Sequence, residues 1–367
     1  MKIIIASGTY KPEISGQSTF ISNLISALKK VEPSFDVSVV TYSDSKPAEA
    51  EDKIYRVPRN LFRHFSYFLQ IKKLLNQDSI IYAQDLFSSG LPSALAKMKK
   101  KKLVIRLGGD FLWEKMVNSG KIKVPLSQYY QLKKTFVEKF YLFLYRFVLK
   151  RADLLIFNTL WQKNFYQSIF NLSADHLAVI ENPFPTIGSA VIDQDQQYNQ
   201  AIVFAGRFIK LKNLTSLVDV FRKIKTDKKL ILIGEGPEKI NLQNRAAGDN
   251  RIEFIDSKGR EELLKILASS YLVVLPSLSE LNPNLAMECL GLKKPMVLTS
   301  EVGFRPEIKK SFKLVDPTSQ EQIKQAIEFF LVPDNYNLFV ENLQSTEISK
   351  YSWDDLAKKH IDFFSNL

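Results

Sequence analysis

Short apolar runs alternate with longer amphipathic stretches along almost the whole chain. One set of runs covers residues 2–6, 37–42, 79–83, 102–107 and 153–158, and a second set covers residues 201–206, 229–234, 251–255, 271–276 and 295–299. Runs that are apolar throughout are typical of strands buried on both faces of a parallel sheet, and the stretches between them, such as residues 18–30, have helical periodicity. The pattern predicts an α/β protein.

The alternation is interrupted at residues 180–200, where two prolines, a glycine and a polar tail are typical of an interdomain linker. The chain has 367 residues, which exceeds the roughly 250–300 at which a single core stops growing. We therefore predict two doubly wound domains, residues 1–185 and 186–349. The final segment, residues 350–367, is amphipathic and predicts a helix capped by Ser352 or Asp354.

Positive charge is concentrated in the first part of the chain. Residues 1–150 hold 25 Lys and Arg against 12 Asp and Glu, a net +13, whereas residues 151–367 hold 26 against 27, a net −1. This asymmetry is expected of a protein with an anionic partner, and equally of a protein from a lysine-rich proteome. No basic-aromatic recognition motif lies on a single element, so we expect no nucleic acid partner.

Two segments, residues 59–75 and 131–151, combine cations with apolar positions. Such helices can lie on the anionic leaflet of a membrane, and they can equally be ordinary packing helices. The chain has one cysteine, Cys289, no uncharged apolar stretch of membrane-spanning length and no recognisable signal peptide. We expect a cytoplasmic protein, with peripheral association at the inner face of the membrane as an open alternative.

Polar residues follow the strands of the second predicted domain at their carboxyl ends, where open α/β sheets bind ligands. Gly206 permits a tight turn after the run at 201–206, and Arg207 and Lys212 precede a predicted helix. Two cations at the start of a helix can bind a phosphate or diphosphate, because the helix amides and dipole add to their charge. The two side chains could also be solvated surface cations.

Two carboxylates, Glu280 and Glu288, flank the turn that follows the run at 271–276. The amides of Asn284 and Leu285, at the start of the next predicted helix, would point toward a phosphate, and each carboxylate can accept two hydroxyl hydrogen bonds from a vicinal diol. The arrangement fits a nucleotide sugar, with one acid on the sugar and the other on the ribose. Spacing alone also allows two solvated surface acids.

Together these residues resemble the motifs of the retaining glycosyltransferases of family 4, the group 1 glycosyl transferases. The matches in the second domain are "GR" at 206–207 with Lys212, "GEGP" at 234–237, "PS" at 276–277, Glu280 and Glu288, "SEVGFRPE" at 300–307 and "LVDP" at 314–317. The first domain matches more loosely, through "SGQS" at 15–18, "ENP" at 181–183 and "SW" at 352–353. The resemblance implies a GT-B fold, that is, two facing Rossmann-like doubly wound domains with an interdomain cleft, the first completed by the C-terminal helix 350–367.

The resemblance also implies a function: a retaining hexosyltransferase of polysaccharide biosynthesis. It would move a sugar from a nucleotide-sugar donor to a hydroxyl of a glycan or lipid-linked acceptor. Arg207 and Lys212 would bind the donor diphosphate and stabilise the leaving nucleotide. Glu280 would bind the donor sugar, Glu288 the ribose, and Gly16 would let the backbone of the first domain approach the donor. The family needs no bound metal, so we expect neither a metal nor another cofactor.

Two departures from the family pattern bear on these roles. Pro283 lies in the turn after Glu280, where the family has a glycine, and it has no amide to donate to a phosphate. Many relatives carry a histidine after the strand at 102–107, where this chain has Gly108, Gly109 and Asp110. Asp110 would orient the acceptor hydroxyl, or alternatively cap the helix that follows it.

Two other classes of function remain open. A nucleotide-sugar epimerase on the same scaffold should have catalytic histidines at the cleft, and the three histidines of this chain, at 64, 176 and 360, lie elsewhere in the sequence. A non-catalytic basic protein of the membrane surface would explain the charge, but it would not explain polar residues placed at successive strand ends.

Overall fold

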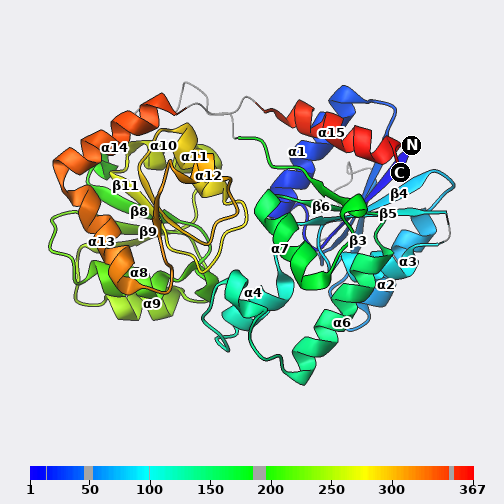
Figure 1. Cartoon of the computed structure of the whole chain (residues 1–367), viewed down its shortest axis with the longest axis horizontal. Coiled ribbons are helices and arrows are strands. Elements are labelled where there is room, and N and C mark those ends of the chain that lie inside the picture. Colours follow the sequence, from blue (N-terminus) through cyan, green and yellow to red (C-terminus); the bar gives the residue numbers. More distant parts are fainter. Residues whose placement is uncertain (14, 45–52, 99, 185–195, 347–350) are drawn as a thin grey trace. The chain divides into compact units, whose positions relative to one another are not determined.

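The computed structural model describes residues 1–13, 15–44, 53–98, 100–184, 196–346 and 351–367. They form two compact α/β units, each built on its own parallel sheet (Figure 1). The first unit comprises Met1–Leu112, Lys133–Pro183 and Tyr351–Leu367, and the second comprises Trp113–Leu132 and Phe184–Lys350. The predicted α/β class is therefore confirmed.

Seven parallel strands form the sheet of the first unit, in the order β3-β2-β1-β4-β5-β6-β7. Their bounds are β1 (Lys2–Ser7), β2 (Asp36–Tyr42), β3 (Ile54–Val57), β4 (Ser79–Ala83), β5 (Lys102–Leu107), β6 (Leu154–Phe157) and β7 (Leu177–Val179). Ile5 pairs with Val39 on one side and with Tyr82 on the other. The winding direction therefore reverses between β1 and β4, and such a reversal opens a ligand crevice at the carboxyl ends of the strands.

Helices pack on both faces of this sheet. The core on one face includes α1 (Gly16–Val31) and the C-terminal helix α15 (Trp353–Ser365). The neighbouring helices α2 (Arg63–Leu74), α3 (Gly90–Ala96) and α6 (Phe136–Arg151) form another layer, and α7 (Leu160–Phe170) and η1 (Ala174–His176) precede β7. Ser352, and not Asp354, caps α15, since its side chain accepts from the Asp355 amide. Asp354 instead forms an ion pair with Lys30 of α1.

Six parallel strands form the second sheet, in the order β10-β9-β8-β11-β12-β13. Their bounds are β8 (Ala201–Ala205), β9 (Lys229–Ile233), β10 (Ile252–Ile255), β11 (Leu272–Leu275), β12 (Met296–Thr299) and β13 (Lys313–Val315). The helices of this unit are α5 (Leu126–Tyr129), η3 (Gln196–Tyr198), η4 (Lys210–Lys212), α8 (Leu214–Phe221), α9 (Lys239–Ala246), α10 (Arg260–Ser269), α11 (Asn284–Gly291), α12 (Pro306–Lys309), α13 (Gln320–Leu331) and α14 (Pro333–Ser345). The winding reverses between β8 and β11, so the carboxyl edge of this sheet is also where a ligand crevice is expected.

The hydrophobic pattern did not predict three strands, β3, β7 and β13, which lie at sheet edges. Each is three or four residues long and mostly half-exposed, so none has the continuous apolar run of a central strand. Most of the predicted linker lies outside the described residues. Residues Trp113–Leu132 belong to the second unit, although the predicted first domain spans residues 1–185. The chain passes from the first unit to the second within the helix α4 (Phe111–Asn118).

Candidate functional site

Two glycine turns lie against each other at the carboxyl ends of β8 and β9. Gly234 and Gly236 have φ angles of +142° and +155°. A Cβ on Gly234 would lie 2.0 Å from the carbonyl oxygen of Gly206, and one on Gly236 would lie 2.4 Å from that of Phe208. Both positions therefore require glycine. The close packing of the two turns fixes the backbone at Gly206 and Phe208. It therefore also fixes the backbone position of Arg207, which lies between them.

The two predicted diphosphate cations lie on the loop after β8. Arg207 is exposed, and Lys212 is the last residue of η4. The next residue, Asn213, is buried, and its side-chain amide donates to the carbonyl oxygens of Pro276 and Pro317, at 3.2 and 2.8 Å. Asn213 therefore ties this loop to the segments that follow β11 and β13, so Lys212 is held close to the neighbouring strand ends.

The structure brings Lys212 and Glu280 into contact. The Lys212 Nζ lies 2.5 Å from Glu280 Oε1, and their side chains are only 20% and 11% exposed. The backbone of Glu280 is also fixed, because its amide donates to the Glu301 carbonyl and its own carbonyl accepts from Gly303. A cation and a carboxylate predicted from separate motifs thus share one partly buried position at the carboxyl edge of the sheet.

The helix α11 begins immediately after this pair. Its first intrahelical bond runs from the Met287 amide to the Pro283 carbonyl, so the amides of Asn284, Leu285 and Ala286 precede the helical ladder. Pro283 is the N-cap residue of the helix, and its missing amide falls before these three. The departure from the family pattern therefore leaves the first-turn amides in place, where an anion would bind.

Glu288 lies in the second turn of α11 and is largely buried. Burial raises the pKa of this carboxyl, and the positive charge of Arg260 opposes that shift. The Arg260 Nε lies 3.6 Å from Glu288 Oε1, and the Arg260 side chain is 58% exposed. Sequence reasoning missed Arg260, although as the first residue of α10, in the segment after β10, it follows the same strand-end rule as the residues that were predicted.

Residues Trp113–Leu132 pack against the loops that carry these predicted residues. The Leu126 amide donates to Ser279 Oγ at 2.8 Å, the Lys123 ammonium donates to Ser216 Oγ at 3.1 Å, and Asn118 Oδ1 accepts from the Leu211 amide at 3.3 Å. Ser279 and Leu211 are each sequence neighbours of the Lys212–Glu280 pair. The segment also borders a cavity of about 280 Å³ that is lined by Lys123, Lys210, Thr215, Glu238 and Asn241 among others. No sequence pattern pointed to this packing.

The other two predicted site residues, Gly16 and Asp110, belong to the first unit. Gly16 is the first residue of α1, with open space where a Cβ would stand, and Ser15 caps the helix. Asp110 precedes α4, is buried, and accepts a hydrogen bond from the Tyr166 hydroxyl at 2.7 Å. Their proposed roles toward donor and acceptor stay predictions.

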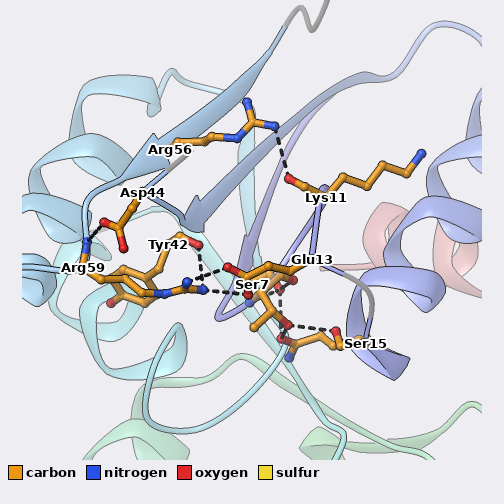
Figure 2. Close-up of polar contacts among 10 residues, drawn as sticks. Ser7, Lys11, Glu13, Ser15, Tyr42, Asp44, Arg56 and Arg59 are labelled. Carbon is orange, nitrogen blue, oxygen red and sulfur yellow. Dashed lines mark hydrogen bonds and ion pairs between the residues drawn. The ribbon is translucent and has the colours of Figure 1, made fainter. Parts of the chain in front are cut away.

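A polar network holds the loop between β1 and α1, as Figure 2 shows. The Arg59 guanidinium forms an ion pair with Glu13, and the Arg59 amide donates to Asp44 at 2.8 Å. Arg56 donates to the carbonyl oxygen of Lys11 at 3.2 Å. These contacts anchor the loop that leads into the "SGQS" motif, and sequence reasoning identified none of them.

All three histidines belong to the first unit, whereas the Lys212–Glu280 pair belongs to the second. His64 contacts the Tyr42 hydroxyl at 3.0 Å, and His360 is buried against the Tyr82 hydroxyl at 2.9 Å. Within the described ranges, no three His, Cys, Asp or Glu side chains gather as metal ligands would. Metal independence itself stays a prediction. Among the same residues, no helix is long and apolar enough to cross a membrane.

Two family models match consecutive parts of the chain. The model described as "Glycosyltransferase Family 4" matches residues 14–186, and the model described as "Glycosyl transferases group 1" matches residues 193–342. The two matches leave only the ends of the chain and a short segment between the two matched ranges uncovered.

Curated relatives are glycosyltransferases by name. The uncharacterised glycosyltransferase MJ1178 of Methanocaldococcus jannaschii is 24% identical over 83% of this chain and 80% of its own length. MJ1607 of the same organism is 24% identical over 54% of this chain, and the match spans only 56% of that relative. The putative teichuronic acid biosynthesis glycosyltransferase TuaC of Bacillus subtilis is 25% identical over 34% of this chain and 31% of its own length.

Solved structures share the fold along both whole chains. Anabaena HepE in complex with UDP and glucose has a TM-score of 0.74 at 15% identity, with 100% of both chains covered. WaaG, a glycosyltransferase involved in lipopolysaccharide biosynthesis, has a TM-score of 0.72 at 12% identity, again with 100% of both chains covered. With two α/β units, strand-end motifs in the expected order and both family models matched, the chain belongs to the family 4 glycosyltransferases and has their GT-B fold.

Proposed function

We propose that this protein is a retaining glycosyltransferase that moves a hexosyl group from a nucleoside diphosphate sugar to a hydroxyl of a glycan or lipid-linked acceptor. The observation that carries the proposal is the partly buried contact between Lys212 and Glu280 at the carboxyl edge of the second sheet. Exposed Arg207 lies on the loop after β8, and the amides of the first turn of α11 precede the helical hydrogen-bond ladder. HepE, which has the same fold, has been solved with UDP and glucose.

The residues divide between the two ends of the donor. Arg207, Lys212 and the amides of Asn284 and Leu285 would bind the diphosphate, and Glu288 would accept hydrogen bonds from the ribose hydroxyls. In the structure the Lys212 ammonium is paired with Glu280. On donor binding it would lie between that carboxylate and the diphosphate, so Glu280 would both orient the lysine and accept hydroxyls of the sugar.

Charge stabilisation would account for much of the catalysis. As the bond between the anomeric carbon and the diphosphate oxygen breaks, negative charge grows on the leaving nucleoside diphosphate. Arg207 and Lys212 would stabilise that charge, and preorganised charge of this kind is usually the largest catalytic contribution. Transfer with retention would then place the acceptor oxygen on the face that the diphosphate leaves, with a diphosphate oxygen taking the acceptor proton. None of these steps needs a metal ion.

The epimerase alternative is not favoured, because both matched family models and the curated relatives are glycosyltransferases. His64 and His360 are hydrogen-bonded within the first unit, to the hydroxyls of Tyr42 and Tyr82. A non-catalytic membrane-surface protein is not favoured either, since it would not require charged residues at successive strand ends. We further expect a cytoplasmic location, a role in polysaccharide biosynthesis and peripheral association with the membrane.

The test begins with a panel of nucleotides in a thermal-shift assay. A ligand present at about 100 times its dissociation constant should add about 2.7 kcal/mol of stability, so the correct nucleoside diphosphate should raise the unfolding temperature clearly. Sugar donors of that nucleotide are then assayed for transfer or slow hydrolysis, and the anomeric configuration of the released sugar is read by NMR. A panel in which no nucleotide stabilises the protein would contradict the proposal, and an inverted product would contradict retention.

A further inference from the structure

Exposed phenylalanines gather on one layer of the first unit. Within the part of the chain that the structure describes, the exposed phenylalanines are Phe62, Phe65, Phe136, Phe140 and Phe143, and each is between 56% and 87% exposed. All lie on α2, on α6 or just before α2. On α6 the spacing of four and three residues puts them along one side of the helix. Large apolar side chains exposed together mark an interaction site.

The helix α3 lies between α2 and α6 and continues this surface. It packs against both neighbours, and the three helices run side by side in Figure 1. Leu95 on α3 and Met98 just beyond its end are exposed, as are Leu61 and Leu69 around α2 and Val137 on α6. We call the exposed side chains of the described residues in segments 59–77, 90–102 and 131–151 the aromatic-basic face.

Much of the positive charge of the first half of the chain lies in the segments that form this face. Its three segments contain 15 Lys and Arg and a single acid, Glu138. Glu138 is buried, where it forms the capping box of α6 with Thr135, so it contributes nothing to the surface. Among the cations, Arg63, Lys72, Lys139, Arg146 and Lys150 are exposed on the helices themselves.

The chemistry of the face favours a lipid surface over a protein partner. The centres of protein interfaces are depleted in lysine, whereas here α2 and α6 each carry exposed lysines together with exposed phenylalanines, and further lysines follow α3. Rings at the headgroup level, with cations beside them, are the features of helices that lie on anionic leaflets. On such a surface the phenylalanine rings would be buried at the boundary of the acyl chains, and the lysines and arginines would pair with the lipid phosphates.

We propose that the aromatic-basic face docks the first unit on the surface of an anionic phospholipid bilayer, with the phenylalanines of α2 and α6 inserted among the headgroups. Only the purpose of docking rests on the proposed function: if the protein is a glycosyltransferase, docking on a bilayer favours a lipid-linked acceptor over a soluble glycan. The docking itself requires neither donor nor acceptor. It resolves the two open alternatives for residues 59–75 and 131–151, because these helices both pack on the sheet and present an apolar, basic outer side.

The experiment is co-sedimentation of the full chain with vesicles of phosphatidylcholine, with and without phosphatidylglycerol. Binding should require phosphatidylglycerol and should fall sharply between about 0.05 M and about 0.5 M salt, because the screening length shrinks from about 14 Å to about 4 Å. Phe140→Glu and Phe143→Glu should each weaken the partition constant by about tenfold or more, since an inserted ring is lost. Lys139→Gln or Arg146→Gln should weaken it by about fivefold at low salt.

The controls separate docking from folding and from the donor site. Ile240→Glu and Leu338→Glu change equally exposed apolar residues on α9 and α14 of the second unit, and should bind vesicles like the wild type. Nucleoside diphosphate binding should be unchanged in every variant, so a failure of docking and a failure of the donor site are read independently. The proposal is overturned by binding that ignores lipid charge or by equal losses in face and control variants. It is also overturned by a stable dimer that Phe140→Glu dissociates, because a second copy would then cover the face.

Discussion

Replacing Glu280 and Glu288 separately by glutamine should produce two different defects. Glutamine keeps the size of each side chain and removes its charge, so the change addresses the carboxylate alone. Glu288→Gln should weaken binding of both the nucleoside diphosphate and the intact sugar nucleotide. Glu280→Gln should leave nucleoside diphosphate binding nearly intact and should lower the rate of transfer, because its proposed ligand is the sugar.

The size of the Glu288 effect follows from its surroundings. A hydrogen bond to a charged group is worth about 1.5–3 kcal/mol, which corresponds to a rise of about 10- to 150-fold in the dissociation constant. The charged partner seen beside it, Arg260, is 3.6 Å away and mostly exposed. Such an exposed ion pair is worth at most about 1 kcal/mol. Arg260→Gln should therefore lower the affinity for the nucleoside diphosphate by no more than about fivefold. Because burial raises the pKa of Glu288, a neutral side chain there should not lower the unfolding temperature.

Glu280→Gln acts beside a cation. Its carboxylate pairs with Lys212, so the substitution leaves Lys212 without its charged partner. The diphosphate is itself anionic and can take over that role, which is why affinity for the nucleoside diphosphate should hold. Transfer should fall by about 10²-fold, by analogy with the loss of one preorganised group in a transition state.

Titration calorimetry with the nucleoside diphosphate, set beside turnover of the full donor, separates the two defects. Glu328→Gln is the matched control, since Glu328 is an exposed carboxylate on α13 paired with Lys324 at 3.5 Å, and it should change neither quantity. If both site variants lose nucleoside diphosphate affinity equally, or neither loses affinity or turnover, the assignment of the two acids to opposite ends of the donor is wrong.

Three further outcomes are expected. Arg207→Ala and Lys212→Ala should each lower turnover by about 10²-fold or more in steady-state assays, and wild-type rates in both would remove the diphosphate assignment. Transfer should persist in excess chelator, whereas activity that disappears and returns with magnesium or manganese would reject metal independence. Burial lowers the pKa of His360 to about 3, so the folded protein keeps this imidazole neutral while the unfolded chain protonates it below its ordinary value of about 6.5. Stability should therefore fall as pH drops through that value, by about 2 kcal/mol between pH 8 and pH 5 in urea unfolding. His360→Asn should not show this pH-dependent loss of stability. If the free energies of unfolding of the two proteins change with pH in parallel, His360 is not its cause.

The sequence by itself determined the elements whose residues carry their own signal. The central strands are continuous apolar runs because both faces of a parallel sheet are covered, so β1, β4, β8 and β11 can be recognised without any knowledge of their neighbours. The glycines of "GEGP" and the cations after β8 could be placed at strand ends for the same reason. The fold class and the order of the motifs along the chain followed from these local patterns.

Only the tertiary structure decided what depends on distant parts of the chain. The edge strands β3, β7 and β13 exist because a neighbouring strand is there to pair with them, and their own residues are too few and too exposed to show it. The contact of Lys212 with Glu280 joins loops 68 residues apart, and the packing of Leu126 on Ser279 joins residues 153 apart. The aromatic-basic face likewise needed α3 between α2 and α6, since periodicity shows which side of a helix is apolar but not which helices lie side by side. Contacts between strand ends and between helix layers are set by how the sheet is wound, and winding is a property of the whole chain.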